Sequence, residues 1–408
     1  MEPTMQMIAI CATPPGINPG MASVELALKL FLDKYKIIQD IKFFHLIHDN
    51  YNEDSGDNNI LPYSEIPDAP DFFASKRMIL FWGDFLHMLQ YHQTIASVLY
   101  QRKYCKTFEE SIRRVYNVFL FADQDHKILK RKISFGSTLL FNTLADENDS
   151  IYGPALKRFI ASGNIWFRDV YSSIKASHIT GNYSISNLGI DCAAFLEPTL
   201  FVGGVKKKGK RNKTGLFIGR TVVNFLDIYR FALDFAKFSS TSLSWMAWGN
   251  INAFPTLKFV QEEKTISEME NFSVEGIADP VIAVRNLTEF DVIITDTYHI
   301  CVNAWNMGIP AICFYGNDHL KRRNVNSGDL FSGKDKRKVF YSMYDALDFL
   351  IHYQELRYSE SRESRMNHLL DCWNDQVLLT GIHQRIRQHS KYSEEILVKA
   401  IVTLLKTT

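Results

Sequence analysis

The stretch from Thr288 to Tyr315 constrains the fold of this chain more than any other. Its residues 292–294 form an apolar β-branched run, which is typical of a parallel strand covered on both faces. A helical pattern follows, Gly308 and Pro310 end it, and residues 311–314 begin another apolar run. The pattern predicts a strand, a tight turn, a short helix and a second strand, which is the repeating unit of an open α/β sheet.

This pattern places His299 in the first helical turn, directly after the carboxyl end of a strand. Ligands of open α/β sheets bind at that end, and the N–H groups of a helix N-terminus favour an anion there. We therefore predict a ligand site at His299, with Asp296 or Thr297 as the helix cap. The helix N-terminus should lower the pKa of His299 and favour neutral imidazole unless a carboxylate such as Asp296 offsets it. The alternative is that His299 only satisfies a local carbonyl group.

Length and composition limit the class of protein. A chain of 408 residues exceeds one ordinary core, so two domains are expected. A content of 46% hydrophobic and 22% charged residues indicates a folded globular protein, and a net charge of +1 gives no reason to expect a nucleic-acid partner. The six cysteines stand singly, which favours free thiols in a reducing compartment and no metal site. Without a signal peptide or a long apolar run, we expect a cytoplasmic protein.

Apolar runs alternate with helical patterns along the whole chain, which predicts an α/β fold of two Rossmann-like, doubly wound domains facing a cleft. The first domain is expected at 1–200, with an exposed loop at 51–70. Its predicted strands are Met5–Ala12, Ile41–His48, Arg77–Trp82, Val115–Phe121, Ile133–Phe135, Asn164–Phe167 and Ile190–Leu196.

Two turns in the first domain are candidates for binding an acceptor. The loop at 13–20 is rich in Pro and Gly and contains Asn18 and Gly20, and a second turn contains Gly83 and Asp84. Glycine at such turns allows close approach of the backbone to a ligand. The first loop lacks the spacings of a dinucleotide fingerprint and of a P-loop. It can equally be an ordinary connection, and Asp84 can equally be the cap of the next helix.

A basic segment at 201–214 is expected to be a linker, with attraction to anionic lipid headgroups or a charged polymer as its alternative role. The second domain is expected at 215–385 and a final amphipathic helix at 386–408, capped by Ser393 and docked across the junction. The second domain should contain strands 215–220, 242–248 and 338–344, a helix at 226–238 and one or two long helices at 346–379.

Five motifs, in this order, resemble the polysaccharide pyruvyl transferase family over most of the chain. They are the Asn18-Pro-Gly20 turn, Leu80-Phe-Trp-Gly83, Arg168-Asp169-Val-Tyr-Ser172, Asp191-Cys-Ala-Ala-Phe195-Leu196, and Thr297-Tyr298-His299 through Gly308-Ile309-Pro310.

The resemblance implies a two-domain fold like that of the inverting glycosyltransferases (GT-B-like). It also implies transfer of a pyruvyl ketal from phosphoenolpyruvate to a sugar of a cell-surface polysaccharide or its lipid-linked precursor, without a cofactor. By position, His299 would be the acid or the phosphate ligand and Arg168 a cation from the first domain. An enzyme of this kind would work in the cytoplasm, with possible peripheral contact with the inner face of the membrane. Arg168-Asp169 can instead be an internal ion pair, and Asp191 can be structural.

The chain departs from the family at Thr297, where the family has an arginine. A hydroxyl does not replace a guanidinium opposite a carboxylate or phosphate. Either another cation compensates, or the donor is a nucleotide sugar and the protein is a glycosyltransferase. A third hypothesis is a scaffold that has lost the chemistry. The donor side is expected to contain Asp296, Thr297, Gly219, Arg220, Tyr315, Lys321 and Arg322, with Arg323 as a further cation.

The sequence offers one short acidic pattern of the kind that holds a metal beside a nucleotide sugar. Asp123-Gln-Asp125 has the right spacing, but it lies in a polar stretch before a basic segment. We therefore expect no metal ligand there.

Overall fold

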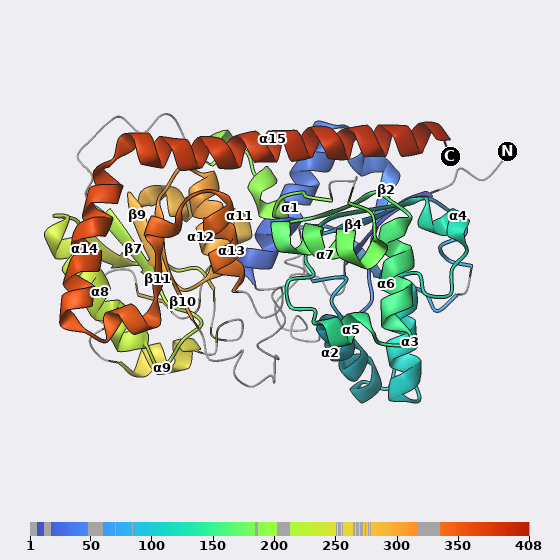
Figure 1. Cartoon of the computed structure of the whole chain (residues 1–408), viewed down its shortest axis with the longest axis horizontal. Helices are drawn as coiled ribbons and strands as arrows, with labels where there is room; N and C mark the ends of the chain where they lie inside the picture. Colours follow the sequence, from blue (N-terminus) through green and yellow to red (C-terminus); the bar gives the residue numbers. More distant parts are fainter. Residues whose placement is uncertain are drawn as a thin grey trace.

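A computed structural model describes residues 6–11, 18–47, 60–69, 71–83, 85–183, 187–201, 213–249, 251, 254, 256–263, 266, 269, 272–273, 275, 277, 279–316 and 335–407. The chain forms two α/β domains that lie side by side, each built on one parallel sheet, and a long C-terminal helix runs along both (Figure 1). The predicted fold class is confirmed.

The N-terminal sheet has the strand order β3-β2-β1-β4-β5-β6, and every pairing between these strands is parallel. This is the Rossmann order, in which the winding direction reverses between β1 and β4 and leaves a crevice at their carboxyl ends. The strands are β1 Gln6–Cys11, β2 Ile41–His45, β3 Tyr63–Glu65, β4 Lys76–Trp82, β5 Lys132–Ser137 and β6 Ile165–Phe167. The helices are α1 Pro19–Lys34, α2 Leu89–Gln101, α3 Phe108–Phe119, α4 His126–Leu129, α5 Leu144–Glu147, α6 Tyr152–Ala161 and α7 Val170–Thr180.

The C-terminal sheet has the order β11-β10-β9-β7-β8, again with parallel pairings. Here the winding direction reverses between β7 and β9. The strands are β7 Lys213–Phe217, β8 Ser242–Trp245, β9 Val292–Thr295, β10 Ala311–Tyr315 and β11 Leu350–His352. The helices are α8 Phe225–Phe238, α9 Thr256–Glu262, α11 Pro280–Asn286, α12 Tyr298–Asn306, α13 Lys336–Met343, α14 Ser359–Asn374 and α15 Gln376–Thr407.

One apolar core continues from the N-terminal domain into the C-terminal domain. Val24 and Phe31 of α1, Phe195 of the 3-10 turn η3 (Cys192–Phe195), and Ile300 and Trp305 of α12 belong to the same buried cluster. Because apolar packing of this kind is close and excludes water, it fixes α1 against α12. The beginnings of these two helices are thereby held together at the junction.

Helix α15 crosses both domains as a single helix of 32 residues, about 48 Å at 1.5 Å per residue. On the C-terminal domain, His383 Nδ1 lies 3.1 Å from the carbonyl oxygen of Trp305. On the N-terminal domain, Arg387 forms a 2.8 Å ion pair with Glu197, and Ser390 Oγ donates to the carbonyl of Ala194. The predicted docking of a C-terminal helix across the junction is confirmed, although the helix begins at Gln376 and not at residue 386.

The expected cap at Ser393 is wrong, because Ser393 is fully buried in the middle of α15. The serine followed by two glutamates resembles the sequence pattern of a helix N-terminus, although it lies inside a helix here. The predicted limits of the domains themselves stay predictions, and residues 202–212 of the basic linker lie outside the described residues.

Three predicted strands are wrong. Residues 115–119 belong to α3, which begins at Phe108. Its cap is Thr107, whose hydroxyl oxygen accepts the Glu110 N–H at 3.1 Å. Residues 338–343 belong to α13, capped by Asp335. In both, an apolar and aromatic run that suits a strand is the buried face of a helix. The third, at 190–196, contains the 3-10 turn η3.

Two other segments differ from prediction. The expected helix at 346–379 contains β11 before α14 begins, and the expected loop at 51–70 contains the short edge strand β3. Both strands have only three residues, too few to show a period.

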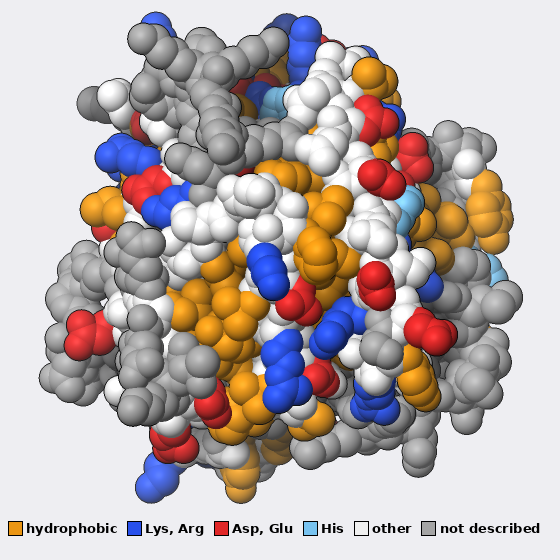
Figure 2. All heavy atoms as spheres, turned by 90° about the vertical axis from the view of Figure 1, so that its left-hand side faces the viewer, with side chains coloured by type: hydrophobic (Ala, Val, Ile, Leu, Met, Phe, Trp, Pro, Cys, Tyr) orange, Lys and Arg blue, Asp and Glu red, His pale blue; other side chains and the backbone are white. Residues whose placement is uncertain are grey.

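The outer face of the C-terminal domain, which carries α8 and α14, has apolar side chains next to Lys and Arg side chains (Figure 2). On α8, Leu226, Leu233 and Phe238 are exposed, whereas Phe225, Ile228 and other residues of its opposite side are buried. None of the described helices is both long enough and apolar enough to cross a bilayer.

Candidate active site at the domain junction

The switch points of the two sheets meet at the junction. Helix α1 follows β1 and helix α12 follows β9, and Gly20 in the first turn of α1 faces His299 in the first turn of α12. A Cβ atom at Gly20 would lie 2.6 Å from Nδ1 and 2.9 Å from Cβ of His299. Glycine is therefore what allows the two helix N-termini to come this close. Asn303 Nδ2 joins the helices further by donating to Ser23 Oγ at 3.0 Å.

His299 is only 8% exposed, and its Nε2 atom is buried without a hydrogen-bond partner among the described residues. Burial lowers the pKa of its imidazole to about 3; Asp191 acts in the opposite direction, and Lys336, Arg168 and Arg220 lower the pKa further. The neutral imidazole expected from the sequence agrees with this. The main cause is burial, however, and the opposing carboxylate is Asp191 instead of Asp296.

Arg168, at the end of β6, forms a buried ion pair with Asp191, with 3.2 Å between Nη1 and Oδ2. Burial raises the pKa of Asp191, but Arg168 and His299 outweigh that effect and bring it below the usual value. The Tyr298 hydroxyl donates to the same carboxylate. Arg168 is thus a buried partner of Asp191. The internal pair with Asp169 considered from the sequence stays a prediction.

Cations from both domains stack on the same aromatic rings. The Arg168 guanidinium lies 5.0 Å from the centre of the Phe85 ring and 5.2 Å from that of Tyr298. The Lys336 ammonium of α13 lies 5.2 Å and 4.7 Å from the same two rings. Arg168, Tyr298 and Lys336 line a narrow pocket between the domains that has about the space of one water molecule.

Asp296 has a different environment from the one expected. Its carboxylate accepts the backbone N–H groups of Gly219, Arg220 and Thr221 at 2.8, 2.8 and 2.9 Å. The Thr297 hydroxyl donates to it at 3.2 Å, and no side chain caps α12. Of the two predicted caps, Thr297 occupies the N-cap position of α12, but its hydroxyl binds Asp296 instead of a helix N–H, and Asp296 binds the β7 loop.

Arg337 completes this arrangement and was missed in the sequence. Its Nη1 donates to the carbonyls of Asp296 and Phe314 at 2.9 and 2.8 Å, which ties the ends of β9 and β10 together. Its other nitrogens bind Asp335 on both carboxylate oxygens. Arg337 and Lys336 were both missed because the residues after Asp335 were interpreted as leading into a strand. Asp335 is a good helix-cap residue and indicates a helix instead.

The remaining predicted residues lie around the junction. Asn18 Oδ1 caps α1 by accepting the Gly20 N–H at 3.1 Å. Gly83 has φ +71° and a Cβ there would lie 2.7 Å from Val24 Cγ1, so its role in the structure is close packing on α1. Arg220 is exposed and stacks on Phe254, with 4.6 Å between its guanidinium and the ring centre. Tyr315, at the end of β10, packs against His352.

Asp169 explains most of the Arg-Asp-x-x-Ser motif. It caps α7 by accepting the Ser172 N–H at 2.8 Å, and its other oxygen accepts from the hydroxyls of Thr138 and Ser172. Asp84, Lys321, Arg322 and Arg323 lie outside the described residues.

No family model and no curated protein matches this sequence. Solved structures with a similar fold include UDP-GlcNAc 2-epimerase from Neisseria meningitidis bound to UDP-GlcNAc, with TM-score 0.51, 11% identity, and coverage of 98% of this chain and 100% of that one. Another is the S. aureus MnaA-UDP co-structure, with TM-score 0.51, 10% identity, and coverage of 98% of each chain.

These similarities extend over both domains and define the class of fold. The chain has the two-domain, GT-B-like architecture, with parallel sheets facing a common junction and a helical C-terminus. The resemblance to the pyruvyl transferase family has no support from these comparisons beyond this fold.

Proposed function

We propose that the protein is a GT-B transferase that binds a nucleotide-sugar donor at the domain junction. The observation that carries this proposal is His299: a buried imidazole at the meeting point of two helix N-termini, with Nε2 lacking a partner among the described residues. A buried polar atom normally has a hydrogen-bond partner, so a bound ligand is the natural one here. The surrounding cations indicate that the ligand is an anion.

Arg168 and Lys336 suit the diphosphate of such a donor. When the bond between the sugar and the diphosphate breaks, negative charge develops on the leaving oxygen, and positioned cations stabilise it. Asp191 holds Arg168 in place, since the two form a buried pair. His299, neutral in the free protein, would donate or accept one hydrogen bond, and a nearby diphosphate would raise its pKa.

Two observations favour a nucleotide sugar over phosphoenolpyruvate. The similar structures from Neisseria meningitidis and S. aureus were solved with UDP-GlcNAc and UDP. In addition, the Thr297 hydroxyl donates to Asp296, so it does not replace the charge of the family's arginine. We propose a glycan or lipid-linked sugar as the acceptor, bound on the side of the N-terminal domain, in the cytoplasm.

Binding can be tested by calorimetry and thermal shift with UDP, UDP-GlcNAc and phosphoenolpyruvate. A ligand present at about 100 times its dissociation constant should stabilise the protein by about 2.7 kcal/mol. We expect a shift with the uridine ligands that is strongly reduced in His299→Gln and in Lys336→Gln. Lys237→Gln, an exposed lysine of α8, is the matched control and should bind as the wild type does.

The possible outcomes of this experiment distinguish the nucleotide-sugar, pyruvyl-transfer and scaffold hypotheses. A shift with phosphoenolpyruvate alone would restore pyruvyl transfer. Equal binding of UDP-GlcNAc by wild type and both junction variants would move the donor site elsewhere. A protein that binds none of these ligands would leave the scaffold hypothesis as the better one.

A further inference from the structure

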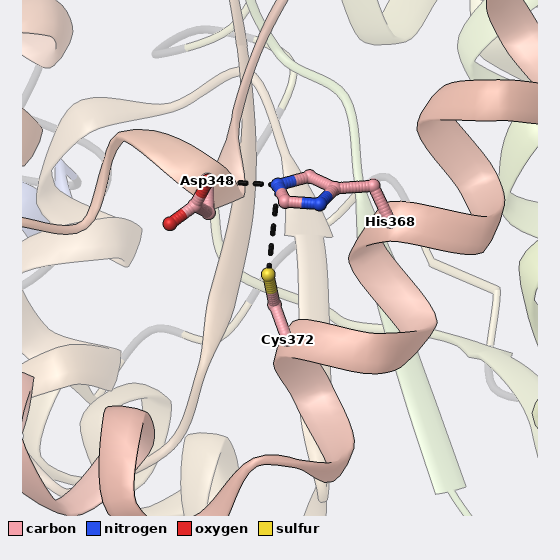
Figure 3. A group of neighbouring side chains, drawn as sticks. All are labelled: Asp348, His368 and Cys372. Atoms are coloured by element: carbon pink, nitrogen blue, oxygen red, sulfur yellow. Dashed lines mark hydrogen bonds and ion pairs between the residues drawn. The ribbon is translucent and has the colours of Figure 1, made fainter.

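A second group of polar side chains lies away from the junction, within the C-terminal domain. Asp348 comes from the 3-10 turn η7 (Leu347–Phe349), immediately before β11, and His368 and Cys372 come from α14 (Figure 3). The two α14 residues are one helical turn apart and so share one face of the helix. Among the residues that the structure describes, these three can bring one ligand atom each to within 4.8 Å of one another.

The contacts within the group all involve one imidazole nitrogen. His368 Nε2 lies 2.7 Å from Asp348 Oδ1 and 3.6 Å from Cys372 Sγ. A catalytic Cys-His-Asp relay needs one ring nitrogen for the nucleophile and the other for the acid. Here both partners meet the same nitrogen, as Figure 3 shows. The three atoms therefore converge on a common point, which is the arrangement of metal ligands.

The spacing fits a tetrahedral ion. With metal–nitrogen and metal–sulfur bonds of about 2.0 and 2.3 Å, tetrahedral geometry separates the two ligand atoms by roughly 3.5 Å. The observed nitrogen–sulfur distance is 3.6 Å. The nitrogen–oxygen distance of 2.7 Å is shorter than the roughly 3.3 Å expected between ligands. A small rotation of the Asp348 side chain would lengthen this distance to the expected value. Such a rotation is possible because the side chains of His368 and Asp348 are 47% and 45% exposed.

We propose that Asp348, His368 and Cys372 form a binding site for Zn²⁺. A thiolate, an imidazole and a carboxylate are the ligands that zinc takes in proteins, and the soft thiolate disfavours Mg²⁺ and Ca²⁺. Exposure on one side leaves the fourth position to water. Cys372 is only 8% exposed, so the thiolate would approach the ion from the protein side.

The ion would fasten α14 to the edge of the C-terminal sheet. A protein link already exists there, because Arg365 of α14 donates to the carbonyls of Asp348 and Leu350 at 3.0 and 2.8 Å. This link holds Asp348 opposite α14 before any ion binds. Binding of the ion would therefore require little further ordering of the backbone around Asp348. A bound ion that prefers the folded state stabilises it.

The test is titration of the metal-free full-length protein with Co²⁺, a spectroscopic substitute for zinc. We expect one equivalent to give a visible tetrahedral spectrum and a near-ultraviolet thiolate-to-cobalt band, with displacement of both by Zn²⁺. Cys372→Ser should lose the thiolate band, and His368→Asn and Asp348→Asn should each weaken affinity at least tenfold. Zn²⁺ should raise the melting temperature of the wild type and not of Cys372→Ser.

Cys105→Ser is the matched control, because Cys105 is equally buried at 8% and belongs to the other domain. It should retain the wild-type spectrum and stoichiometry. An unchanged band in Cys372→Ser, or a wild type that shows no saturable thiolate band, would overturn the proposal. If Cys372→Ser failed to fold, the half-exposed Asp348 and His368 variants would decide: wild-type Co²⁺ affinity in both would equally overturn it.

Discussion

Two buried carboxylates lie near the junction, Asp296 directly after β9 and Asp191 directly before η3, and their environments differ. Asp296 accepts three backbone N–H groups and a threonine hydroxyl. Asp191 faces Arg168, and the imidazole of His299 close by has a nitrogen without a partner among the described residues. The pKa of Asp296 is raised by burial, whereas that of Asp191 is lowered with the help of Arg168 and His299. The first environment is complete without a ligand, and the second is open to one.

The difference teaches which of the predicted residues are structural. From the sequence, Asp296, Thr297 and Gly219 were expected on the donor side, next to His299 and Arg168 as the residues that act on the ligand. In the structure the first three saturate one another's hydrogen bonds, so they hold the β7 loop against β9. We therefore assign the binding of charge to His299, Arg168 and Lys336, and the following variants test that division from the largest effect to the smallest.

Asp296→Ala should destabilise the protein most. It leaves the buried N–H groups of Gly219 and Thr221 and the part-buried N–H of Arg220 without their acceptor, and each loss of a buried partner costs about 1–3 kcal/mol. We expect a decrease of about 5 kcal/mol in the free energy of unfolding, measured in urea. Asp234→Ala, which removes a half-exposed carboxylate 3.9 Å from Arg362, is the control and should cost under about 1 kcal/mol. A mild effect at Asp296 would mean that water replaces the carboxylate.

Arg168→Met should cost about 4 kcal/mol, because it leaves the Asp191 carboxylate buried and unpaired. The double variant Arg168→Met/Asp191→Leu should recover most of that stability, since two apolar side chains replace the ion pair. Urea unfolding of both variants and of Asp191→Leu forms a double-mutant cycle. Additive effects would contradict the coupling between the two residues. The double variant should fold but fail to bind a uridine ligand.

His299 should make the protein less stable as the pH falls. Its pKa is about 3 in the folded protein against an ordinary value of 6.5, so the unfolded chain takes up the proton first. Stability is thus present above pH 6.5 and is lost as the pH falls toward 3, by about 2 kcal/mol between about pH 7 and pH 5.

The measurement for His299 is urea unfolding at several pH values for wild type and His299→Gln. Glu25, whose pKa burial raises to about 7, gives the opposite slope in the same window, so only the difference between the two proteins isolates His299. Parallel pH profiles would show that the imidazole is already solvated or charged.

Gly20→Ala should affect stability less than Asp296→Ala or Arg168→Met does, and it should affect binding more than stability. A methyl group 2.6 Å from Nδ1 of His299 must push α1 from α12, at a cost of about 1–3 kcal/mol. Gly381→Ala is the control in α15: its Cβ would meet only Arg385 Nη1 at 3.5 Å, and alanine should stabilise the helix by about 1 kcal/mol. Uridine binding that survives Gly20→Ala would place the donor outside this contact.

Much of the fold could be predicted from the sequence. Strands such as β1, β4 and β9 are continuous apolar runs, and such a run can be recognised from a few neighbouring residues. Two of the failed strand predictions share one cause. In α3 and α13 the buried helix face contains β-branched and aromatic residues in close succession, and at that length a strand and a buried helix look alike. The caps Thr107 and Asp335 were the signals that could have separated them.

For the site, the sequence predicted the place of His299 correctly because a strand end and a helix start fix it locally. The hydrogen-bond and ion-pair partners of the other site residues could not be predicted from the sequence. Arg168 and Asp191 are separated by 23 residues, and Asp296 and Gly219 by 77, so nothing in a motif says which side chains meet. Likewise, Asp348 is not near His368 and Cys372 in the sequence, and only the fold brings them together.

The sequence by itself thus determined the α/β class, the two domains and the carboxyl-end position of His299, since hydrophobic period and turn residues act over a few positions. The tertiary structure alone decided that Asp296 is a brace, that Arg168 pairs with Asp191, and that Lys336 joins the site from another element. The physical reason is that charge pairing and desolvation depend on distances through space, which the packing of α1, α12 and α13 at the junction sets.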